Sequence, residues 1–409
     1  MKLIENIAQL ATCRGEGGQG EVHAVADAAI VWEGDTIRWV GPGRELPAGY
    51  QGAERLDAGG RLVVPGLVDC HTHLAFGGWR ADEFTQRIEG AGYLEIARAG
   101  GGIARTVRLT REAGEEALYR RARAFVREMV ALGVTTIECK SGYGLDREHE
   151  LKLLRVYRRL AESEPVGIVP TFLGAHMVPP EYRERREAYV ALLVDQLIPE
   201  VAARRLATCC DVFVEESSFG VEEGRRILLA GQAAGLASRL HADQLTSCGG
   251  AELAAEVVRR EGPHLEQVSD RGIAAMAESR VVAVSLPLAT LYLGHRPLPA
   301  RALIEAGAAV AVATDFNPGT APSYDLPLAM MLACTIQRMT PGEALKGATI
   351  YAARAIGQEA ATGSLEVGKR ADFALIDAPD VTHWLYHFRP NACQLTVASG
   401  EIRWSSPDR

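Results

Sequence analysis

The middle of the chain alternates short apolar runs with helical patterns, and this alternation constrains the fold more than any other feature of the sequence. Strands that alternate with helices pair in parallel, because each helix carries the chain back to the start of the next strand. The pattern therefore predicts an α/β fold. At least seven such runs lie between about residues 63 and 315, and they read RLVVPGLVDC, GVTTIECK, VGIVPTFLGA, DVFVEE, LASRLHA, VVAVSLP and AVAVATD.

Two architectures fit this alternation, a TIM (β/α)8 barrel and an open doubly wound sheet. Several of the runs end abruptly in His, Lys, Asp or Glu. A barrel collects functional residues at the carboxyl ends of many different strands, so the polar run ends favour the barrel. No glycine-rich phosphate loop follows any of the runs, which counts against nucleotide hydrolysis and dinucleotide binding. We therefore expect a TIM barrel over residues 63–360.

Both ends of the chain differ from the middle and indicate short strands joined by tight turns. Residues 26–42 alternate apolar and polar side chains around Gly34-Asp35, which is a hairpin signature. Residues 363–379 and 395–404 show the same pattern. We expect residues 1–62 and 361–409 to combine into a small β-sandwich domain beside the barrel. The clearest helix of the middle spans 110–133, with Thr110 as its N-cap and Gly133 as its C-cap.

Composition excludes several classes of partner. The formal net charge is -8 and the Lys and Arg residues form no blocks, so nucleic acid and anionic membrane surfaces are poor partners. The apolar stretches are far too short to span a bilayer, and the N-terminus lacks the apolar core of a signal peptide. Eight cysteines are scattered without a CxxC motif, which indicates a reducing compartment and predicts a cytoplasmic location.

A candidate metal site stands at the ends of three apolar runs. His71 and His73 occupy positions i and i+2 of an extended segment, so their side chains point to the same face. His241 ends a second run and Asp315 a third. Alone, the HxH pair could arise by chance and Asp315 could be a helix N-cap. Together, three imidazoles and one carboxylate suit a single Zn²⁺ or iron ion.

Longer segments resemble a known family. The chain is similar to the mononuclear members of the amidohydrolase superfamily and, within them, to the imidazolonepropionases of histidine degradation, over residues 60–375 or so. The HTH motif alone is typical of the superfamily, as is GSLEVGKRADF near the C-terminus. The segments that carry the closer resemblance are VVPGLVDCHTHLAFGGWRADEF, GVTTIECKSGYGLD, PTFLGAHMVPPEY, LHADQLTSCGGAELA and VATDFNPGTAPSYDLPLAMMLACT.

The resemblance implies a function and a set of site residues. It implies a homodimeric hydrolase that opens the cyclic amide of 4-imidazolone-5-propanoate to give N-formimidoyl-L-glutamate, using water activated by one Zn²⁺ or iron (Fe²⁺ or Fe³⁺) ion. Asp315 would accept the proton of the water and deliver it to the departing ring nitrogen. The planar fork of Arg80 suits the propionate carboxylate. The implied residues are His71, His73, His241 and Asp315 as metal ligands; Asp315, His264 and His176 in catalysis; and Arg80, Tyr143, His176, Gln244, Asn317, Gly319 and Thr320 in substrate binding.

Three features bear on the alternatives. Gln244 occupies the place where deaminases of the superfamily carry a proton-shuttling Glu, and an amide cannot carry a proton at neutral pH, which disfavours a deaminase. Gly262-Pro263 precedes His264 where the family commonly has Ala-Asp, so a carboxylate beside His264 is lost. Lys140 is expected to be structural or substrate-facing, because the ligand set is complete without it. Three alternatives remain: another cyclic amidase, a deaminase, and a barrel without activity. A barrel without activity should have lost at least one metal ligand, but all four ligand positions are occupied by ligand residues.

Overall fold

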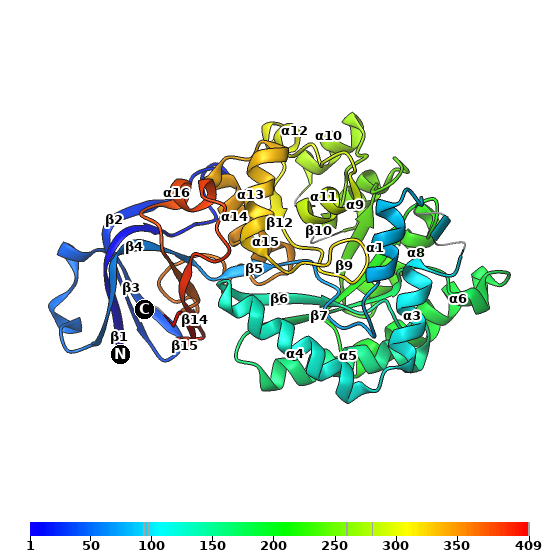
Figure 1. Cartoon of the computed structure of the whole chain (residues 1–409), viewed down its shortest axis with the longest axis horizontal. Coiled ribbons are helices and arrows are strands. Elements are labelled where there is room, and N and C mark those ends of the chain that lie inside the picture. Colours follow the sequence, from blue (N-terminus) through cyan, green and yellow to red (C-terminus); the bar gives the residue numbers. More distant parts are fainter. Residues whose placement is uncertain (93–94, 97–98, 259–260, 280, 408–409) are drawn as a thin grey trace.

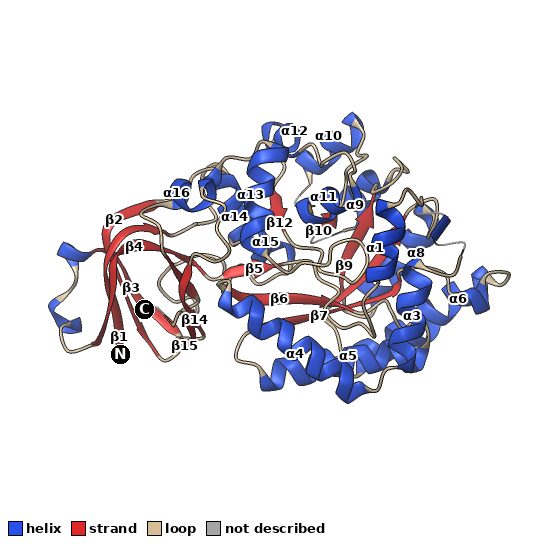
Figure 2. Cartoon of the chain, in the orientation of Figure 1, coloured by secondary structure: helices blue, strands red, loops and turns tan. Residues whose placement is uncertain are grey.

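The middle of the chain forms a barrel-like α/β fold of parallel strands wrapped by helices (Figures 1 and 2). A computed structural model describes residues 1–92, 95–96, 99–258, 261–279 and 281–407. Five parallel strands form one sheet in chain order, and three more form a second. These strands are β5 (Leu67–Asp69), β6 (Val134–Lys140), β7 (Gly167–Ala175), β8 (Cys209–Val214) and β9 (Ala237–Ala242), then β10 (Glu261–Pro263), β11 (Val282–Ser285) and β12 (Val310–Val312).

Backbone pairs at two seams join the sheets into one closed ring. Ala242 pairs in parallel with His264 beyond β10, and Thr72 pairs with Phe316 beyond β12. The amide of Leu265 donates to the carbonyl of Ala242 at 2.9 Å, which fastens the first seam. The result is the TIM-barrel-like fold that the alternating pattern predicts. The sequence runs locate seven of these strands; the eighth, β10, is only three residues long and has no apolar run to mark it.

Helices cover the outside of the barrel, and their apolar faces follow from sequence periodicity. In α4, the side chains of Leu118, Ala122, Val126 and Met129 are buried at helical spacing against the strands. The helices are α1 (Ala81–Ile88), α3 (Gly102–Glu112), α4 (Glu115–Ala131), α5 (Arg147–Ser163), α6 (Arg186–Leu192), α7 (Ile198–Ala203), α8 (Val221–Ala233), α9 (Gly250–Val257), α10 (Asp270–Glu278), α11 (Pro287–Leu293), α12 (Ala300–Glu305), α13 (Leu326–Gln337), α14 (Pro341–Gly347), α15 (Ile350–Ala355) and α16 (Val381–Tyr386), with single turns at Gly43–Glu45, Ala48–Tyr50, Pro180–Tyr182 and Leu193–Leu197.

The expected helix over 110–133 is wrong at its start. Thr110 lies inside α3, and the N-cap of α4 is Gly114, whose extended backbone separates the two helices. The break is stabilised by Lys152, whose ammonium donates to the carbonyls of Thr110, Arg111 and Ala113 at 2.8–3.0 Å. The helix ends one residue earlier than predicted, because its C-cap is Leu132; Gly133 follows with a positive φ of 92°.

Both chain ends contribute to one seven-stranded sheet beside the barrel, in the order β15-β14-β13-β4-β1-β2-β3 (Figure 1). The hairpins around Gly34-Asp35 and Ser399-Gly400 form as expected. The hairpin expected over 363–379 is wrong, because that segment holds only β13, which pairs with β4 and β14 instead. The strands are β1 (Lys2–Ala11), β2 (Ala24–Glu33), β3 (Thr36–Pro42), β4 (Glu54–Pro65), β13 (Phe373–Ile376), β14 (Cys393–Ala398) and β15 (Glu401–Ser405).

This end sheet curls on itself. Trp32 on β2 meets Phe373 on β13 edge to face at 5.2 Å between ring centroids, although two strands, β1 and β4, separate them in the sheet. The indole nitrogen of Trp32 donates to the carbonyl of Gly400 at 2.8 Å and is thereby satisfied in the interior. Among the helices of the described ranges, none combines the length and apolar character that crossing a membrane requires.

Candidate metal centre and active site

The carboxyl ends of the barrel strands bring the HxH pair and Asp315 together. His71 and His73 follow β5, and Asp315 follows β12, the strand that lies beside β5 in the barrel. The amide of Asp315 donates to the carbonyl of His71 at 3.0 Å, and the amide of His73 donates to the carbonyl of Phe316 at 2.8 Å. Asp315 has a left-handed backbone with φ 55°, a strained conformation that is frequent where a side chain is aimed at a functional site.

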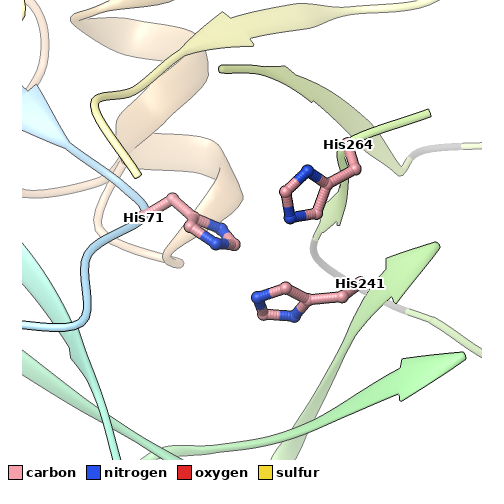
Figure 3. A group of neighbouring side chains, drawn as sticks. All are labelled: His71, His241 and His264. Carbon is pink, nitrogen blue, oxygen red and sulfur yellow. The ribbon is translucent and has the colours of Figure 1, made fainter. Parts of the chain in front are cut away.

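The spacing of the donor atoms fits one metal ion. Nε2 of His71 and Nε2 of His73 each lie 3.6 Å from Oδ1 of Asp315. Two tetrahedral ligands with bonds of about 2.1 Å have their donor atoms about 3.4 Å apart. His241 belongs to the same cluster, since its ring centroid lies 4.5 Å from that of His71, and His71, His241 and His264 point toward one another (Figure 3). All these side chains are buried.

Burial keeps the ligand histidines neutral, as metal binding requires. It lowers the pKa of His71 and His73 well below the ordinary value, and neighbouring cationic groups lower both further. It also lowers the pKa of His241 to about 3. For Asp315, burial raises the pKa to about 7, with Glu266 adding to the effect and His264 opposing it. Without a metal, this carboxyl group would therefore titrate close to neutral pH.

Asp211, on the adjacent strand β8, orients His241. Its Oδ1 accepts from Nδ1 of His241 at 3.0 Å, so the ring carries its proton on Nδ1. Nε2 of His241 is then a lone-pair donor, and it has no hydrogen-bond partner in the described part of the chain. A buried imidazole fixed by a carboxylate on one side and unsatisfied on the other is the arrangement of a metal ligand. The residues at this site therefore fit a divalent ion.

A buried ionic network lies beneath the cluster and holds Asp211. The ammonium of Lys140 lies 2.9 Å from Asp211 Oδ2 and 2.9 Å from Glu138 Oε1, and Arg239 lies 3.4 Å from the same Glu138 oxygen. All four side chains are fully buried, and their two positive and two negative charges balance. Lys140 is thus engaged on both sides by carboxylates, which favours the structural role expected for it.

His264 lies against the same cluster from strand β10. One group of atoms that could hold a metal includes His264 with His71 and His241, within 4.8 Å of one another. Burial lowers its pKa, but the carboxylates of Glu266 and Asp315 outweigh burial and the net shift is upward. His264 is therefore the one histidine of the cluster whose surroundings favour the protonated ring.

His176 and Tyr143 line the side of the cluster nearest β6 and β7. The ring of His176 stacks on His73 at 5.2 Å, and Tyr143 lies 5.5 Å from both rings. Nδ1 of His176 lies 3.0 Å from the carbonyl of Gly142, which can only accept, so Nδ1 carries the proton. Burial lowers the pKa of His176 to about 4. In the neutral ring, Nε2 is therefore an acceptor.

Arg80 reaches the loop that follows Asp315. Its side chain is buried; Nε donates to Glu83 Oε2 at 2.9 Å and one terminal nitrogen to Thr106 at 3.3 Å. A Cβ at Gly319 would lie only 2.3 Å from the guanidinium carbon, so only glycine permits this approach. The guanidinium is thus a buried cation beside the loop of the candidate ligand Asp315.

The polar atoms of Asn317 and Thr320 are used within that loop. The amide nitrogen of Asn317 donates to the carbonyl of Asp315 at 2.7 Å, and its oxygen accepts from the amides of Gly319 and Thr320 at 2.8 Å. These bonds shape the turn around Asp315. Gln244 is half-buried three residues after His241, and it makes no hydrogen bond or ion pair with the residues that the structure describes.

Sequence reasoning missed the buried acids that support the site. Besides Asp211 and Glu266, these include Glu150, which accepts from the amides of Gly142, Gly144 and Leu145 at 2.8–3.1 Å and so holds the loop of Tyr143. Asp211 carries a signal that could have identified it, because a lone charge stands inside the apolar run CCDVFV. Glu150 carries no such signal, since it lies in a helix rich in charges.

Comparison with known proteins places the chain in a family. A model of the amidohydrolase family matches residues 228–403. The imidazolonepropionase of Geobacillus kaustophilus is 47% identical over 92% of this chain and 90% of its own length. That of Cupriavidus necator is 47% identical over 93% and 91%, and that of Porphyromonas gingivalis is 42% identical over 98% and 97%.

Solved structures show the same fold at lower identity. A triazine hydrolase variant superposes with a TM-score of 0.76 at 16% identity, covering 98% of this chain and 94% of its own. An adenosine deaminase from Xanthomonas campestris with bound zinc superposes with a TM-score of 0.72 at 17% identity, covering 98% and 92%. Whereas these two share only the fold, the curated relatives share more than two fifths of their residues over nearly the whole length, and the chain belongs to the imidazolonepropionase family.

Proposed function

We propose that the site hydrolyses the ring amide of 4-imidazolone-5-propanoate and releases N-formimidoyl-L-glutamate, the reaction of the family. The observation that carries this proposal is the pairing of a buried histidine–carboxylate cluster with a buried arginine beside the same loop. The cluster suits activation of water, and the arginine suits a substrate with a carboxylate tail. In the hydrolysis, the hydroxyl group of water joins the carbonyl carbon and a proton joins the ring nitrogen as the C–N bond breaks.

His71, His73, His241 and Asp315 are the proposed ligands of one divalent ion. When bound, the ion supplies Lewis acidity, which makes water a competent nucleophile at neutral pH. The donor set of three imidazoles and one carboxylate suits Zn²⁺ as well as Fe²⁺ or Fe³⁺. Asp211 and Lys140 hold His241 in place from beneath.

Asp315 is the proposed proton carrier. A carboxylate has two oxygens, so one can bind the metal while the other accepts a proton and later releases it. One oxygen faces His71 and His73, and the proton would move between water and the ring nitrogen at this carboxylate. Asn317 fixes the loop behind Asp315 and so holds the carboxylate in position.

Two further histidines are proposed to contact the substrate. His264, whose ring points toward the cluster (Figure 3), would accept a hydrogen bond from the substrate at the ring nitrogen nearest the cluster. His176, held as an acceptor at Nε2, would take a hydrogen bond from a ring N–H of the substrate. Tyr143, packed beside His176, would close the same side of the site.

Arg80 is proposed to bind the propionate. Glu83 and Thr106 each occupy one donor of the guanidinium, which leaves donors on both terminal nitrogens for a carboxylate. Gly319 and Thr320 lie in the loop beside it, and Gln244 is proposed to contact the ring from the loop after β9. The chain as a whole carries a net charge of -8 and repels anions. The buried guanidinium of Arg80 therefore supplies a local positive charge for an anionic substrate.

A comparison of substrates tests this function. Purified protein should release N-formimidoyl-L-glutamate from 4-imidazolone-5-propanoate and should leave the exocyclic amines of guanine and cytosine intact, because Gln244 cannot shuttle a proton. Ammonia release from either amine, without turnover of the imidazolone, would favour the deaminase instead. Mass spectrometry of the products separates the two reactions.

Three further expectations are proposed alongside the activity. Residues 1–62 and 361–409 are proposed to form one small β-sandwich domain beside a barrel domain of residues 63–360, and the separate apolar cluster around Trp32 and Phe373 supports this division. A homodimer is proposed from the family resemblance. A cytoplasmic location, with no nucleic acid or membrane partner, is proposed from the net charge and from eight scattered cysteines without a CxxC motif.

A further inference from the structure

His264 and Glu266 form a buried pair that the proposed mechanism leaves unexplained. Oε1 of Glu266 lies 3.7 Å from Nδ1 of His264, and both side chains are only 4% exposed. Neither Nδ1 of His264 nor Oε2 of Glu266 has a hydrogen-bond partner within the described ranges. Burying an unsatisfied carboxylate and an unsatisfied imidazole nitrogen is unfavourable, unless the two groups serve each other.

The backbone brings the two side chains together. His264 and Leu265 both have left-handed backbones, with φ 73° and 62°, and they turn the chain directly after β10. Two consecutive strained residues persist only where the surroundings fix them, and here the seam with β9 does so. The amides of Leu265 and Gln267 donate to the carbonyls of Ala242 and Asp243 at 2.9 and 2.8 Å. The turn thereby returns Glu266 to the Nδ1 side of the His264 ring.

The other edge of the His264 ring faces the reacting centre. The ring points toward His71 and His241, and the three residues offer donor atoms within 4.8 Å of one another (Figure 3). With Glu266 behind Nδ1, this leaves Nε2 as the atom nearest the cluster. A carboxylate behind one nitrogen fixes the tautomer and orientation of an imidazole whose other nitrogen acts.

We propose that Glu266 is a positioning residue, whose carboxylate accepts a hydrogen bond from Nδ1 of His264 and thereby directs Nε2 to the reacting centre. The contact requires the two groups to approach by about 0.7 Å to reach ordinary hydrogen-bond length. Glu266 thus supplies, two residues after His264, the carboxylate that Gly262-Pro263 lacks before it. The inference rests on the proposed function, because it assigns His264 a part in that reaction.

A double-mutant cycle tests the proposal in the full-length, metal-loaded protein. Glu266→Gln keeps the shape of the side chain, but its amide group can donate to Nδ1 and so stabilise the opposite tautomer. We expect kcat to fall about 10- to 100-fold, the usual effect of removing such a supporting carboxylate, with KM changed less than about 3-fold. In a His264→Asn background, Glu266→Gln should have no further effect, because its route of action is gone. Glu266→Asp, which keeps the charge, should recover part of kcat and serves as the readout if Glu266→Gln fails to fold.

A matched control separates this role from general stability. Glu164 is also a buried carboxylate, but it pairs with Arg123 and Arg127 at the end of α5 and does not contact the site. Glu164→Gln should lower thermal stability without changing kcat. If Glu266→Gln retains wild-type kcat, or if its effect adds fully to that of His264→Asn, Glu266 does not act through His264. A change confined to KM would likewise overturn the proposal, because it would place Glu266 on the substrate.

The tautomer itself can be observed without turnover. Nitrogen NMR of metal-free protein labelled at its histidines should show His264 protonated at Nδ1, with the signal assigned from its loss in His264→Asn. In Glu266→Gln, the proton should shift to Nε2. An unchanged tautomer in this variant would contradict the proposal. If the wild type fails to turn over 4-imidazolone-5-propanoate, the proposed function is wrong, and this spectrum still decides whether Glu266 sets the state of His264.

Discussion

Replacing Asp211 with Asn should weaken both folding and metal binding, because one buried carboxylate serves both. Asp211 accepts from Nδ1 of His241 at 3.0 Å and from the ammonium of Lys140 at 2.9 Å. Burial alone would raise its pKa, but the nearby His241, Lys140 and Arg239 outweigh burial and hold the pKa well below the ordinary value. The carboxylate is therefore charged at neutral pH, and Asn removes that charge without changing the shape of the side chain.

The expected magnitude follows from the balance of charges. Lys140, Arg239, Glu138 and Asp211 are fully buried, so Asp211→Asn removes one of the buried carboxylates that offset the two cations. Breaking one side of a buried ion pair typically costs about 3–5 kcal/mol. Loss of the support for a ligand histidine typically lowers metal affinity about 10- to 100-fold. Because the pKa of Asp211 is lowered, its stabilising effect should persist above the ordinary carboxylate pKa and disappear only at strongly acidic pH.

Two measurements check these values. Urea unfolding of metal-free protein gives the loss of stability, and competition with a coloured chelator gives the metal affinity. Asp372→Asn is the matched control: that carboxylate is also buried, but it binds Arg370, Thr362 and the amide of Ser399 near the end sheet. It should lower stability without changing metal affinity. Wild-type metal affinity in a folded Asp211→Asn protein would refute the role assigned to Asp211.

The remaining predictions concern Arg80 and Asp315. Arg80→Ala should lower kcat/KM for the propionate substrate about 10- to 150-fold, because a charged hydrogen bond worth about 1.5–3 kcal/mol is lost. The same variant should hydrolyse an imidazolone without the tail almost normally. Equal losses for both substrates would count against carboxylate binding by Arg80. Asp315→Asn should retain appreciable metal, measured by elemental analysis, yet lose at least about 100-fold in kcat, and near-normal kcat would exclude the proton-carrying role. Metal affinity of the wild type should fall as pH drops through about 7, because Asp315 must lose its proton to bind. Since the pKa of Asp315 is raised from 3.8, its contribution to the stability of the metal-free protein is fully present below pH 3.8 and is lost as pH rises to about 7. Urea unfolding should therefore show a steeper decline from about pH 4 to 7 in wild type than in Asp315→Asn, which keeps only the decline from other buried acids such as Asp69.

The sequence predicts the barrel because its strands are buried on both faces and so appear as continuous apolar runs. The same reasoning misses β10, whose three residues are placed by bonds to neighbouring strands rather than by their own pattern. It misplaces the start of α4, because Thr110 is an excellent N-cap by type but its hydroxyl is used by the amide of Gly77. The break at Gly114 depends on Lys152, which is distant in sequence.

The candidate ligands could be named from sequence, because HxH and two polar run ends are local patterns. The groups that orient these ligands and set their protonation could not be predicted from the sequence. Asp211 and Lys140 meet His241 only after the four strands β6 to β9 have paired in order, and Glu266 faces His264 only through two left-handed residues. The acceptor state of His176 likewise depends on the carbonyl of Gly142, a contact between two loops.

We propose that the buried cluster at His71, His73, His241 and Asp315 makes this chain a metal-dependent hydrolase of 4-imidazolone-5-propanoate. The most direct test is the rate of N-formimidoyl-L-glutamate formation before and after removal of metal by a chelator, with metal content measured in each sample. We predict that turnover disappears with the metal and returns with one equivalent of Zn²⁺ or iron per chain. Undiminished turnover in fully stripped protein, or no product from folded, metal-loaded protein, would contradict the claim.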